Sequence, residues 1–423
     1  MDDKNHTFSR VPQTERVSLM TTALVRTGMT TALAQFMLGA TLGNSMTFTQ
    51  AMLATFLGSL LLQVVSFGVG FAGTKEGLST SLLARWCGFG RYGSALVGMA
   101  IVISCLGWFG VQNSILAEGI VYGLNEKISF EIAALISGCL LTLLVVMGFI
   151  GLSWTAKLAL PIFSLVMAWM FFDTLRGNNM ADLILSLPQG QSMTIGAGAT
   201  MVAGGAIVGA LITPDITRYC KNGRHVFWMI TISYIIGEFI VNGIAILVAH
   251  ALNTADVVTI MTQSAGWLGL ISVILSAVKV NDTALYSSSL AVINIIETIF
   301  NNKYSYKVIT LLLGVTGTLL SVIGIMKQFV SFLVLLGIVF PPIAGIMMVD
   351  YYILKTNRAS LKVSRKIGKL PESTIPINWS GIFAWLLGGG IGFTIDWGIP
   401  SLNSLLFASA VYWITNISLK KFR

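Results

Sequence analysis

Apolar stretches follow one another along this chain from Met20 to Ile417, separated by short polar segments. Each is about 18–25 residues long, and a helix needs about 20 apolar residues to cross the hydrocarbon core of a bilayer. The pattern predicts about twelve membrane-spanning helices, at residues 18–43, 48–72, 94–122, 130–151, 154–175, 192–213, 226–251, 266–299, 306–326, 329–352, 379–396 and 400–417. Only 10% of the residues are charged and the mean hydropathy is +0.82, which excludes a soluble domain. We expect an all-α polytopic membrane protein.

Basic residues are distributed unevenly between the two sides of the predicted membrane. The net charge of +9 is not gathered into a patch, so no nucleic-acid partner is expected. With a cytoplasmic N-terminus, only Lys127, Arg176 and Lys327 fall in external loops, while Arg26 and Lys279 lie within spans. By the positive-inside rule, this favours two cytoplasmic termini in the plasma membrane or bacterial inner membrane. The polar N-terminal segment shows no signal peptide.

Residues that catalyse reactions or hold metals are scattered. The cysteines have no metal-ligand spacing, so neither a metal nor a cofactor is expected. The three histidines, His6, His225 and His250, lie near predicted aqueous ends, and no HExxH or Ser/Lys constellation is present. A membrane-embedded enzyme is therefore the weaker alternative to a transporter, and no filter-like repeat favours a channel.

Two predicted spans are rich in glycine, and they are the first and the sixth. The runs are Gly28–Gly43 and Gly196–Ala210. Glycine weakens a helix by about 1 kcal/mol relative to alanine. Tight helix packing explains either run alone. Their separation by five spans favours broken helices at corresponding positions of two inverted repeats, with the substrate held where the helices unwind.

The predicted organisation follows from these two runs. The segments are a cytoplasmic tail (1–17), a first repeat of five spans (18–175), a second repeat of five spans (192–352), a basic and solvated cytoplasmic loop (353–378), two further spans (379–417) and a short cytoplasmic tail (418–423).

Charged groups in the eighth span form the densest polar cluster inside the predicted membrane. Lys279 and Asp282 are three residues apart and share a helix face, with Asn281 between them. A charge inside a span is costly unless it pairs or faces water, so it marks a functional site by default. The alternative is a buried structural ion pair.

Other polar residues within the spans have simpler explanations. Glu118 and Glu238 are deep carboxylates, and structural hydrogen bonding is the simpler interpretation of both. Arg26 in the first span either snorkels or pairs with an acid such as Asp215 to form a gate. Pro341 starts a proline pair that will kink the tenth span, as a hinge or as a static bend.

Two aromatic residues lie between glycines in the third span, in the segment Cys105-Leu-Gly-Trp-Phe-Gly110. Tryptophan prefers the membrane interfaces, so Trp108 at mid-membrane depth is unusual. Beside small residues it offers a flat wall for stacking a planar ring. A packed core is the alternative interpretation.

Five segments of the chain together are characteristic of a known family. They are Gly77-Leu-Ser-Thr-Ser-Leu-Leu-Ala-Arg85, Gly107-Trp-Phe-Gly110, Thr213-Pro-Asp-Ile-Thr-Arg218, Asn281-Asp-Thr-Ala-Leu-Tyr286 and Pro341-Pro342. Through them, the chain from about Gly39 to Lys355 resembles the nucleobase:cation symporter family, in its cytosine permease branch. The resemblance implies a LeuT-like fold, with a five-plus-five inverted repeat and two extra helices. It also implies uptake of a planar nitrogenous base by alternating access.

The resemblance transfers the substrate site only in part. Trp108 matches the tryptophan that stacks on the base, whereas the glutamine three positions before it is Cys105 here. The family positions that supply a second aromatic residue and a serine match Ala206 and Val208 here. The family position that supplies an asparagine matches Ser276. This more apolar pocket would discriminate poorly for cytosine. The expected substrate-binding residues are Cys105, Trp108, Phe109, Gly205, Ala206, Val208, Ser276 and Asn281.

The implied ion site also departs from the family. In relatives, two residues with hydroxyl groups hold the sodium ion. The matching positions here are Lys279 and Val280, and valine offers no oxygen to a hard cation. An ammonium group could take the place of sodium, so proton coupling, uncoupled transport and residual sodium coupling are favoured in that order. The expected coupling residues are Lys279, Asp282, Gln35 and Glu118. The expected gating residues are Arg26, Asp215 and Pro341.

These observations predict a secondary transporter that imports a nucleobase-like heterocycle, such as cytosine, a purine or a related pyrimidine, with a proton or sodium as the coupling ion if there is one. The rival within transport is an amino-acid permease, whose substrate carboxylate would need exposed amides such as those of Gly39–Gly43.

Overall fold

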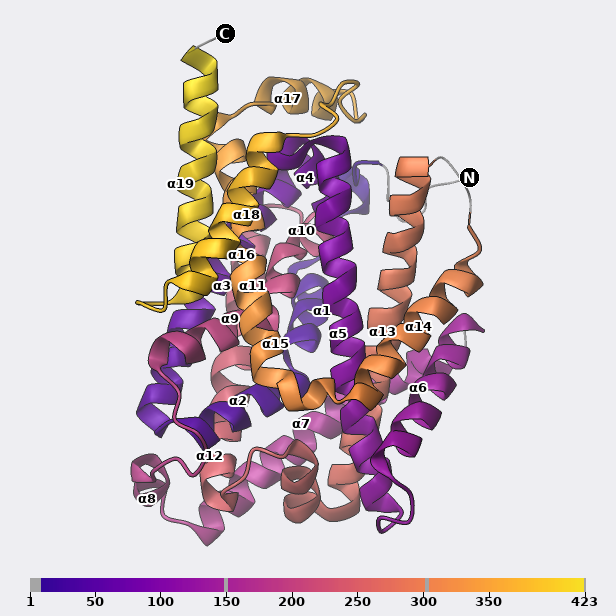
Figure 1. Cartoon of the computed structure of the whole chain (residues 1–423), viewed down its shortest axis with the longest axis vertical. Coiled ribbons are helices and arrows are strands. Elements are labelled where there is room, and N and C mark those ends of the chain that lie inside the picture. Colours follow the sequence, from indigo (N-terminus) through magenta and orange to yellow (C-terminus); the bar gives the residue numbers. More distant parts are fainter. Residues whose placement is uncertain (1–8, 148–150, 301–303, 422–423) are drawn as a thin grey trace.

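The computed structural model describes residues 9–147, 151–300 and 304–421, and these ranges are helical without a β-strand (Figure 1). The spanning elements are α1 (Leu19–Thr30) with α2 (Leu33–Ser45), α3 (Phe48–Glu76), α5 (Gly90–Gly123), α6 (Phe130–Val146), α7 (Gly151–Gly177), α9 (Ile195–Leu211) with α10 (Thr213–Thr217), α11 (Gly223–Tyr234) with η3 (Ile235–Val241) and α12 (Asn242–Leu252), α13 (Val257–Phe300), α14 (Tyr306–Ile323), α15 (Phe329–Val339) with α16 (Pro341–Met348) and η5 (Val349–Leu354), α18 (Trp379–Thr394) and α19 (Pro400–Lys421). The fold class predicted from the hydrophobic pattern is confirmed.

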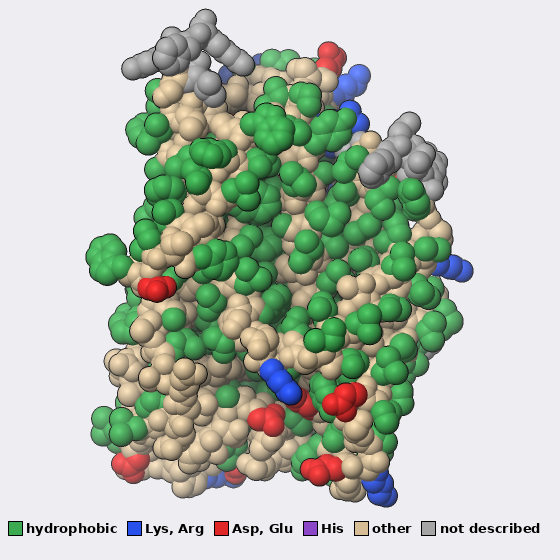
Figure 2. Space-filling view, in the orientation of Figure 1, with side chains coloured by type: hydrophobic (Ala, Val, Ile, Leu, Met, Phe, Trp, Pro, Cys, Tyr) green, Lys and Arg blue, Asp and Glu red, His purple; other side chains and the backbone are tan. Residues whose placement is uncertain are grey.

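Seven helical segments of the described chain are long and apolar enough to cross a membrane by length and composition. They are Phe48–Glu76, Thr80–Gly123, Leu158–Gly177, Gly223–Leu252, Val257–Glu297, Tyr306–Ile323 and Ile325–Leu354. Two shorter apolar helices are α6 and α9. Figure 2 shows one face of the molecule covered mainly by hydrophobic side chains, with few charged ones, as a lipid-facing surface requires.

Short elements connect the spans. They are η1 (Gln13–Glu15), α4 (Thr80–Ala84) with η2 (Arg85–Phe89), α8 (Met180–Leu185), η4 (Ile325–Gln328) and α17 (Arg358–Lys366). The helix α13 begins nine residues before the predicted eighth span and bends at Gly266, whose φ of +53° is accessible to glycine. Residues 1–8 of the predicted N-terminal tail, 148–150 of the predicted fourth span and 422–423 of the C-terminal tail lie outside the described residues.

The first span is broken, as predicted. α1 ends at Thr30 and α2 begins at Leu33, and the backbone dihedral angles of Thr31 and Ala32 between them are not helical. Ala32 is fully extended, with φ −142° and ψ 160°. This two-residue interruption lies within the glycine-rich run and in the interior of the molecule.

The sixth span is interrupted at Ile212, which is two residues beyond its glycine-rich run. Inside the run, α9 stays helical because the glycines let other helices approach its backbone. A Cβ atom on Gly204 would collide with the carbonyl oxygen of Leu333 on α15. The carbonyl oxygen of Ala199 also packs closely against Gly58 of α3, since a Cβ atom there would lie 2.6 Å from it. The run therefore serves packing, and the interruption falls at its end.

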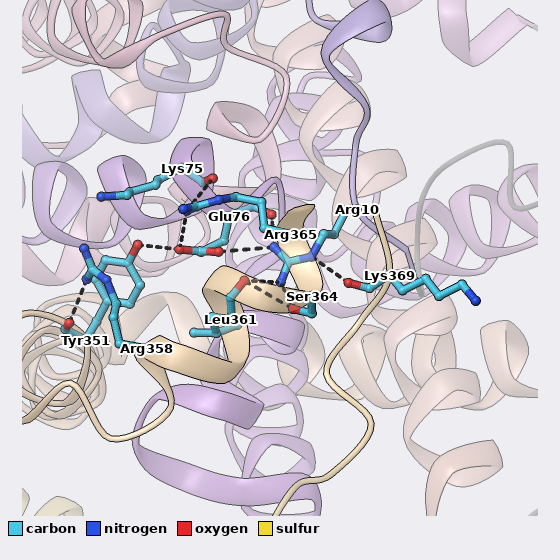
Figure 3. A network of polar contacts seen from close by, with 9 residues as sticks. All are labelled: Arg10, Lys75, Glu76, Tyr351, Arg358, Leu361, Ser364, Arg365 and Lys369. Atoms are coloured by element: carbon cyan, nitrogen blue, oxygen red, sulfur yellow. Dashed lines mark hydrogen bonds and ion pairs between the residues drawn. The ribbon is translucent and has the colours of Figure 1, made fainter. Parts of the chain in front are cut away.

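The end of the molecule that carries α17 and the C-terminal end of α19 is held by a buried carboxylate (Figures 1 and 3). Glu76, at the end of α3, is 2% exposed and pairs with Arg10 at 3.2 Å and with Arg365 of α17 at 2.9 Å. The Tyr351 hydroxyl donates to the same carboxylate at 2.8 Å, and Arg10 also donates to Ser364 at 2.8 Å.

This network corrects one expectation in part. The basic loop was expected to be solvated, and Lys362, Lys366 and Lys369 are exposed, but its helix α17 also packs against the membrane body through buried Leu361 and through Arg365. Burial lowers the pKa of the Arg10 guanidinium, and the neighbouring Glu76 carboxylate opposes that effect. The N-terminal segment and α17 are thus tied together at one acidic residue.

We expect Gly204→Ala to lower the free energy of unfolding by about 2–3 kcal/mol, because the new methyl group meets backbone atoms that cannot rotate away. Gly390→Ala on α18 is the matched control, since nothing lies within 4 Å of its added methyl group. Melting temperatures of the purified variants in detergent test this. Equal melting temperatures for the two variants would contradict the close contact of α9 with α15.

We expect Glu76→Gln to cost about 3–5 kcal/mol of stability, because it leaves the buried Arg10 charge without its counter-charge. Arg365→Gln removes a partner whose side chain is 32% exposed and should cost under about 1 kcal/mol. Thermal unfolding of both variants gives the comparison. A larger loss for Arg365→Gln would place the main attachment on α17 instead.

Candidate functional site

A cavity of about 150 Å³ lies where the break of the first span faces α5, α9 and α13. Its lining combines small and apolar residues with a few polar side chains. The lining residues are Arg26, Met29, Thr30, Ala32, Ala34, Gln35, Leu38, Trp108, Gln112, Gly205, Ala206, Gly209 and Val280. The structure thus brings together five residues that the sequence singled out: Arg26, Gln35, Trp108, Gly205 and Ala206.

Small residues of α9 keep the cavity open. A Cβ atom on Gly205 would collide with the side chain of Leu38, and one on Gly209 would contact the Arg26 guanidinium at 3.6 Å. The missing side chains leave room beside the non-helical backbone of the first span. The glycine run therefore has a second role besides helix packing.

Trp108 forms one wall of the cavity, and its ring is held by aromatic neighbours. It makes edge-to-face contacts with Phe332, at 5.6 Å between ring centroids, and with Phe329, at 6.4 Å. Gly107 permits the approach of Phe332, because a Cβ atom there would strike its ring. Such aromatic pairs favour a defined ring orientation, so the indole is prepared for a planar ligand.

Gln112 is a polar lining residue that the sequence analysis did not select. It is fully buried, and neither its amide nitrogen nor its amide oxygen has a hydrogen-bond partner among the described residues. A buried polar group without a partner is costly, so such a group facing a cavity points to a ligand or water. Its position four residues after Trp108, on the same helix face, could have identified it.

Gln35 connects the cavity to a buried carboxylate on η3. Its Nε2 donates to Glu238 Oε2 at 2.8 Å and to Asn242 Oδ1 at 2.9 Å. Both amide hydrogens of Gln35 are used in this way, and its Oε1 remains as the atom that can accept from a ligand. Glu238 and Asn242 are both fully buried.

Arg26 is 1% exposed and bonds to neutral groups. Its guanidinium donates to the Gly209 carbonyl at 2.7 Å and to the Tyr234 hydroxyl at 3.1 Å. The expected pair with Asp215 is not formed. Asp215 instead accepts from the backbone and hydroxyl of Thr80, both at 3.1 Å, because it lies where α4 begins.

Lys279 reaches back to the break of the first span. Its Nζ donates to the Gly28 carbonyl at 3.1 Å, and it forms no ion pair with Asp282 within 4 Å in the part of the chain that the structure describes. The alternative interpretation, that Lys279 and Asp282 form a buried structural ion pair, is therefore wrong. Beside Lys279 is a void of about 10 Å³, lined also by Thr31 and Ser276, with room for about one water molecule.

The remaining expected site residues lie away from the cavity. Phe109, one position after Trp108, points about 100° away on the helix and packs against Gly317 of α14. Val208 belongs to the packed core, and Cys105 lies against Ser288 of α13. Asn281 is fully buried, and neither of its side-chain amide atoms has a partner among the described residues.

Two further expected residues lie at other levels of the molecule. Glu118 lies in the C-terminal half of α5, where the negative charge of the Asp256 carboxylate acts on it. Pro341 begins α16, so the tenth span is interrupted at Phe340. No group of three or more His, Cys, Asp or Glu side chains that could hold a metal occurs within residues 9–147, 151–300 and 304–421.

The geometry is that of a compact, partly polar cavity at a helix break, and known proteins share the fold. Two structures of Mhp1 superpose on the chain. One, in an inward-facing conformation, has a TM-score of 0.83 and 18% identity and covers 100% of this chain and 94% of that one. The other is described as a nucleobase-cation-symport-1 family transporter in a closed conformation with bromovinylhydantoin bound, and its TM-score is 0.77 at 18% identity, over 99% and 95% of the two chains.

A third structure, a substrate-bound outward-open state of a Na⁺-coupled sialic acid symporter, has a TM-score of 0.64 at 13% identity and covers 97% and 91%. At the sequence level, the cytosine permease of Escherichia coli strain K12 is 27% identical over 415 residues, which cover 98% of this chain and 94% of that protein. The family described as "Permease for cytosine/purines, uracil, thiamine, allantoin" matches residues 10–413. The chain therefore belongs to this family of permeases, and it is a nucleobase-type secondary transporter rather than an enzyme.

Proposed function

We propose that the cavity at the first-span break binds one single-ring, planar nitrogen heterocycle, such as a pyrimidine, and that the protein imports it by alternating access. The observation that carries the proposal is that two residues line the same small cavity. They are Trp108 and Gln112, and the side-chain amide of Gln112 has no hydrogen-bond partner among the described residues. A cavity of about 150 Å³ is the size that holds a benzene ring. The ring would stack on the indole, while Gln112 and the Oε1 of Gln35 would bond to its polar edge.

The positive-inside rule supports an orientation with both termini in the cytoplasm of the cell or bacterium. Arg26 then lies on the cytoplasmic side of the cavity and, through its bond to Gly209, ties α1 to α9. We assign it the role of a gate on that side. Asp215 and Pro341 would act further along the same path, at the α4 contact and at the bend of the tenth span.

Lys279 supports transport that does not depend on sodium. Its ammonium group donates to a carbonyl at the break, where a coupling cation would need oxygen ligands, and the adjacent void has room for about one water molecule. Val280 brings no side-chain oxygen to this place. We therefore assign Lys279 as a fixed positive charge in place of sodium, with uptake driven by a proton gradient or by the substrate gradient alone.

We expect Trp108→Ala to reduce uptake of radiolabelled cytosine or uracil into proteoliposomes by more than about tenfold, since it removes the stacking surface. Gln112→Leu should reduce it by about tenfold, because one polar edge of the ligand loses its partner. Trp397→Ala is the control, as Trp397 is 86% exposed and distant from the cavity in sequence. Uptake that is unchanged in both cavity variants would exclude this cavity as the binding site. Competing amino acids should have no effect.

We expect base uptake to be the same with and without an imposed sodium gradient, and Lys279→Ala to lose most of it, because the Gly28 carbonyl loses its donor. The double variant Lys279→Thr/Val280→Thr restores two hydroxyls and should acquire sodium dependence. Sodium-driven uptake by the unmodified protein would refute the role given to Lys279 and leave the proposed substrate class standing.

A further inference from the structure

The carboxyl group of Glu238 is buried without a basic contact from any residue that the structure describes. It is fully buried, its Oε1 has no hydrogen-bond partner among the described residues, and no ion pair within 4 Å involves it. Its Oε2 accepts from Gln35 at 2.8 Å and from Asn242 at 3.4 Å. An isolated charge at such a position is expensive, which favours a group that gains and loses a proton over a permanently charged one.

Glu238 also lies on an irregular helix turn that touches the first-span break. The segment η3 is a π-helix, a geometry that occurs frequently at functional sites. Its Gly237 packs against Thr30, the last helical residue before the break, so closely that a Cβ atom would collide with that threonine. Glu238 therefore lies on the segment that packs against the break, and Gln35 connects its carboxyl group to the cavity.

Few other charges face this carboxyl group. Arg26 of α1 acts on it electrostatically from a greater distance than an ion pair, and Tyr234 of α11 is the neighbouring titratable group. Among the other elements packed against η3, α2 has no charged residue and α12 has only His250, which bonds to backbone carbonyls at the far end of that helix. α3 has its charged residues, Lys75 and Glu76, at the end that bears α17.

We propose that Glu238 is a proton-binding site of the transporter and that its proton decides, through Gln35, whether the cavity offers a hydrogen-bond acceptor or a donor to the substrate. With Glu238 ionised, Gln35 donates to it through Nε2 and presents Oε1 to the cavity. With Glu238 protonated, the carboxylic O–H needs an acceptor, which Gln35 supplies when its amide turns over together with the amide of its second partner, Asn242. The Gln35 amide hydrogens then face the cavity.

This switch has a consequence for transport. A substrate whose edge carries an acceptor matches the protonated state, so it binds together with a proton, and the coupling is reciprocal. Gln112 has no hydrogen-bond partner among the described residues and adapts to either pattern, so the discrimination lies at Gln35. The proposal rests on the proposed heterocycle site but not on the role given to Lys279.

The test uses the full-length protein in nanodiscs and measures binding of cytosine and uracil by quenching of tryptophan fluorescence, over a pH range in which both bases stay neutral. The two bases carry opposite donor and acceptor patterns at ring positions 3 and 4. Whichever atom faces Gln35, the ratio of the two dissociation constants should change by about tenfold across the titration, which is the value of one matched hydrogen bond.

The variants locate the proton. In Glu238→Gln the ratio should be independent of pH, and in Gln35→Leu it should be independent of pH and near one, because the carboxyl group is no longer connected to the ligand. Asp173→Asn, which neutralises an exposed carboxylate on α7, should behave like the unmodified protein. If Glu238→Gln does not fold, the pH dependence of the unmodified protein and of Gln35→Leu still decides the question.

The outcomes separate the two proposals. Binding of both bases with a constant ratio in the unmodified protein overturns the Glu238 switch and leaves the heterocycle site intact. A ratio that changes with pH equally in Glu238→Gln also overturns it. Absence of binding by either base at every pH refutes the proposed substrate class, and the switch falls with it.

Discussion

The two-residue break in the first span is the constraint on which the rest of the structure depends. In a bilayer, every backbone polar group must be satisfied within the protein, so a helix can be broken only where other groups replace its hydrogen bonds. Here the Gly28 carbonyl, two residues before the end of α1, accepts from Lys279, and the Gly209 carbonyl, near the end of α9, accepts from Arg26. The two basic residues inside the spans thus stabilise the negative ends of two discontinuous helices, which explains why neither needs a carboxylate partner.

Small residues then convert the break into a cavity. The glycines of α9 remove side chains on one side, where Gly205 and Gly209 face Leu38 and Arg26, and permit backbone contact on the other, where Gly204 meets α15. Glycine on a single helix therefore provides both rigidity and space. The indole of Trp108, fixed by Phe329 and Phe332, closes the remaining side with a flat surface. A rigid, partly polar cavity of this kind suits a planar ligand better than a flexible one, because little is lost in ordering the binding site.

Sequence alone could predict the spans, the break of the first helix and the role of Trp108 as a wall, since these depend on hydrophobic length, local glycine content and one unusual aromatic. It could not predict contacts between residues far apart in the chain. The Gln35–Glu238 bond joins positions separated by 203 residues, and nothing local distinguishes Glu238 from a structural carboxylate. The Arg26–Asp215 pair failed for the same reason, because α4 supplies Asp215 with closer donors. Phe109 was misassigned because adjacent helical residues face different directions.

The two donor bonds at the helix ends also bear on how the transporter can move. Any rotation of α1 away from α9 or α13 must break the bond of Arg26 to Gly209 or that of Lys279 to Gly28, and a buried group left without its partner costs about 1–3 kcal/mol. Water that enters the opened side can replace the lost hydrogen-bond partner of either group. Opening therefore costs little free energy only where water can enter. A substrate that fills the cavity excludes this water from the centre, while a side open to bulk solvent admits it at one end. Both bonds are made by α1, at Arg26 and at Gly28, so they oppose opening on the α1 side of the cavity and make that opening depend on the entry of water.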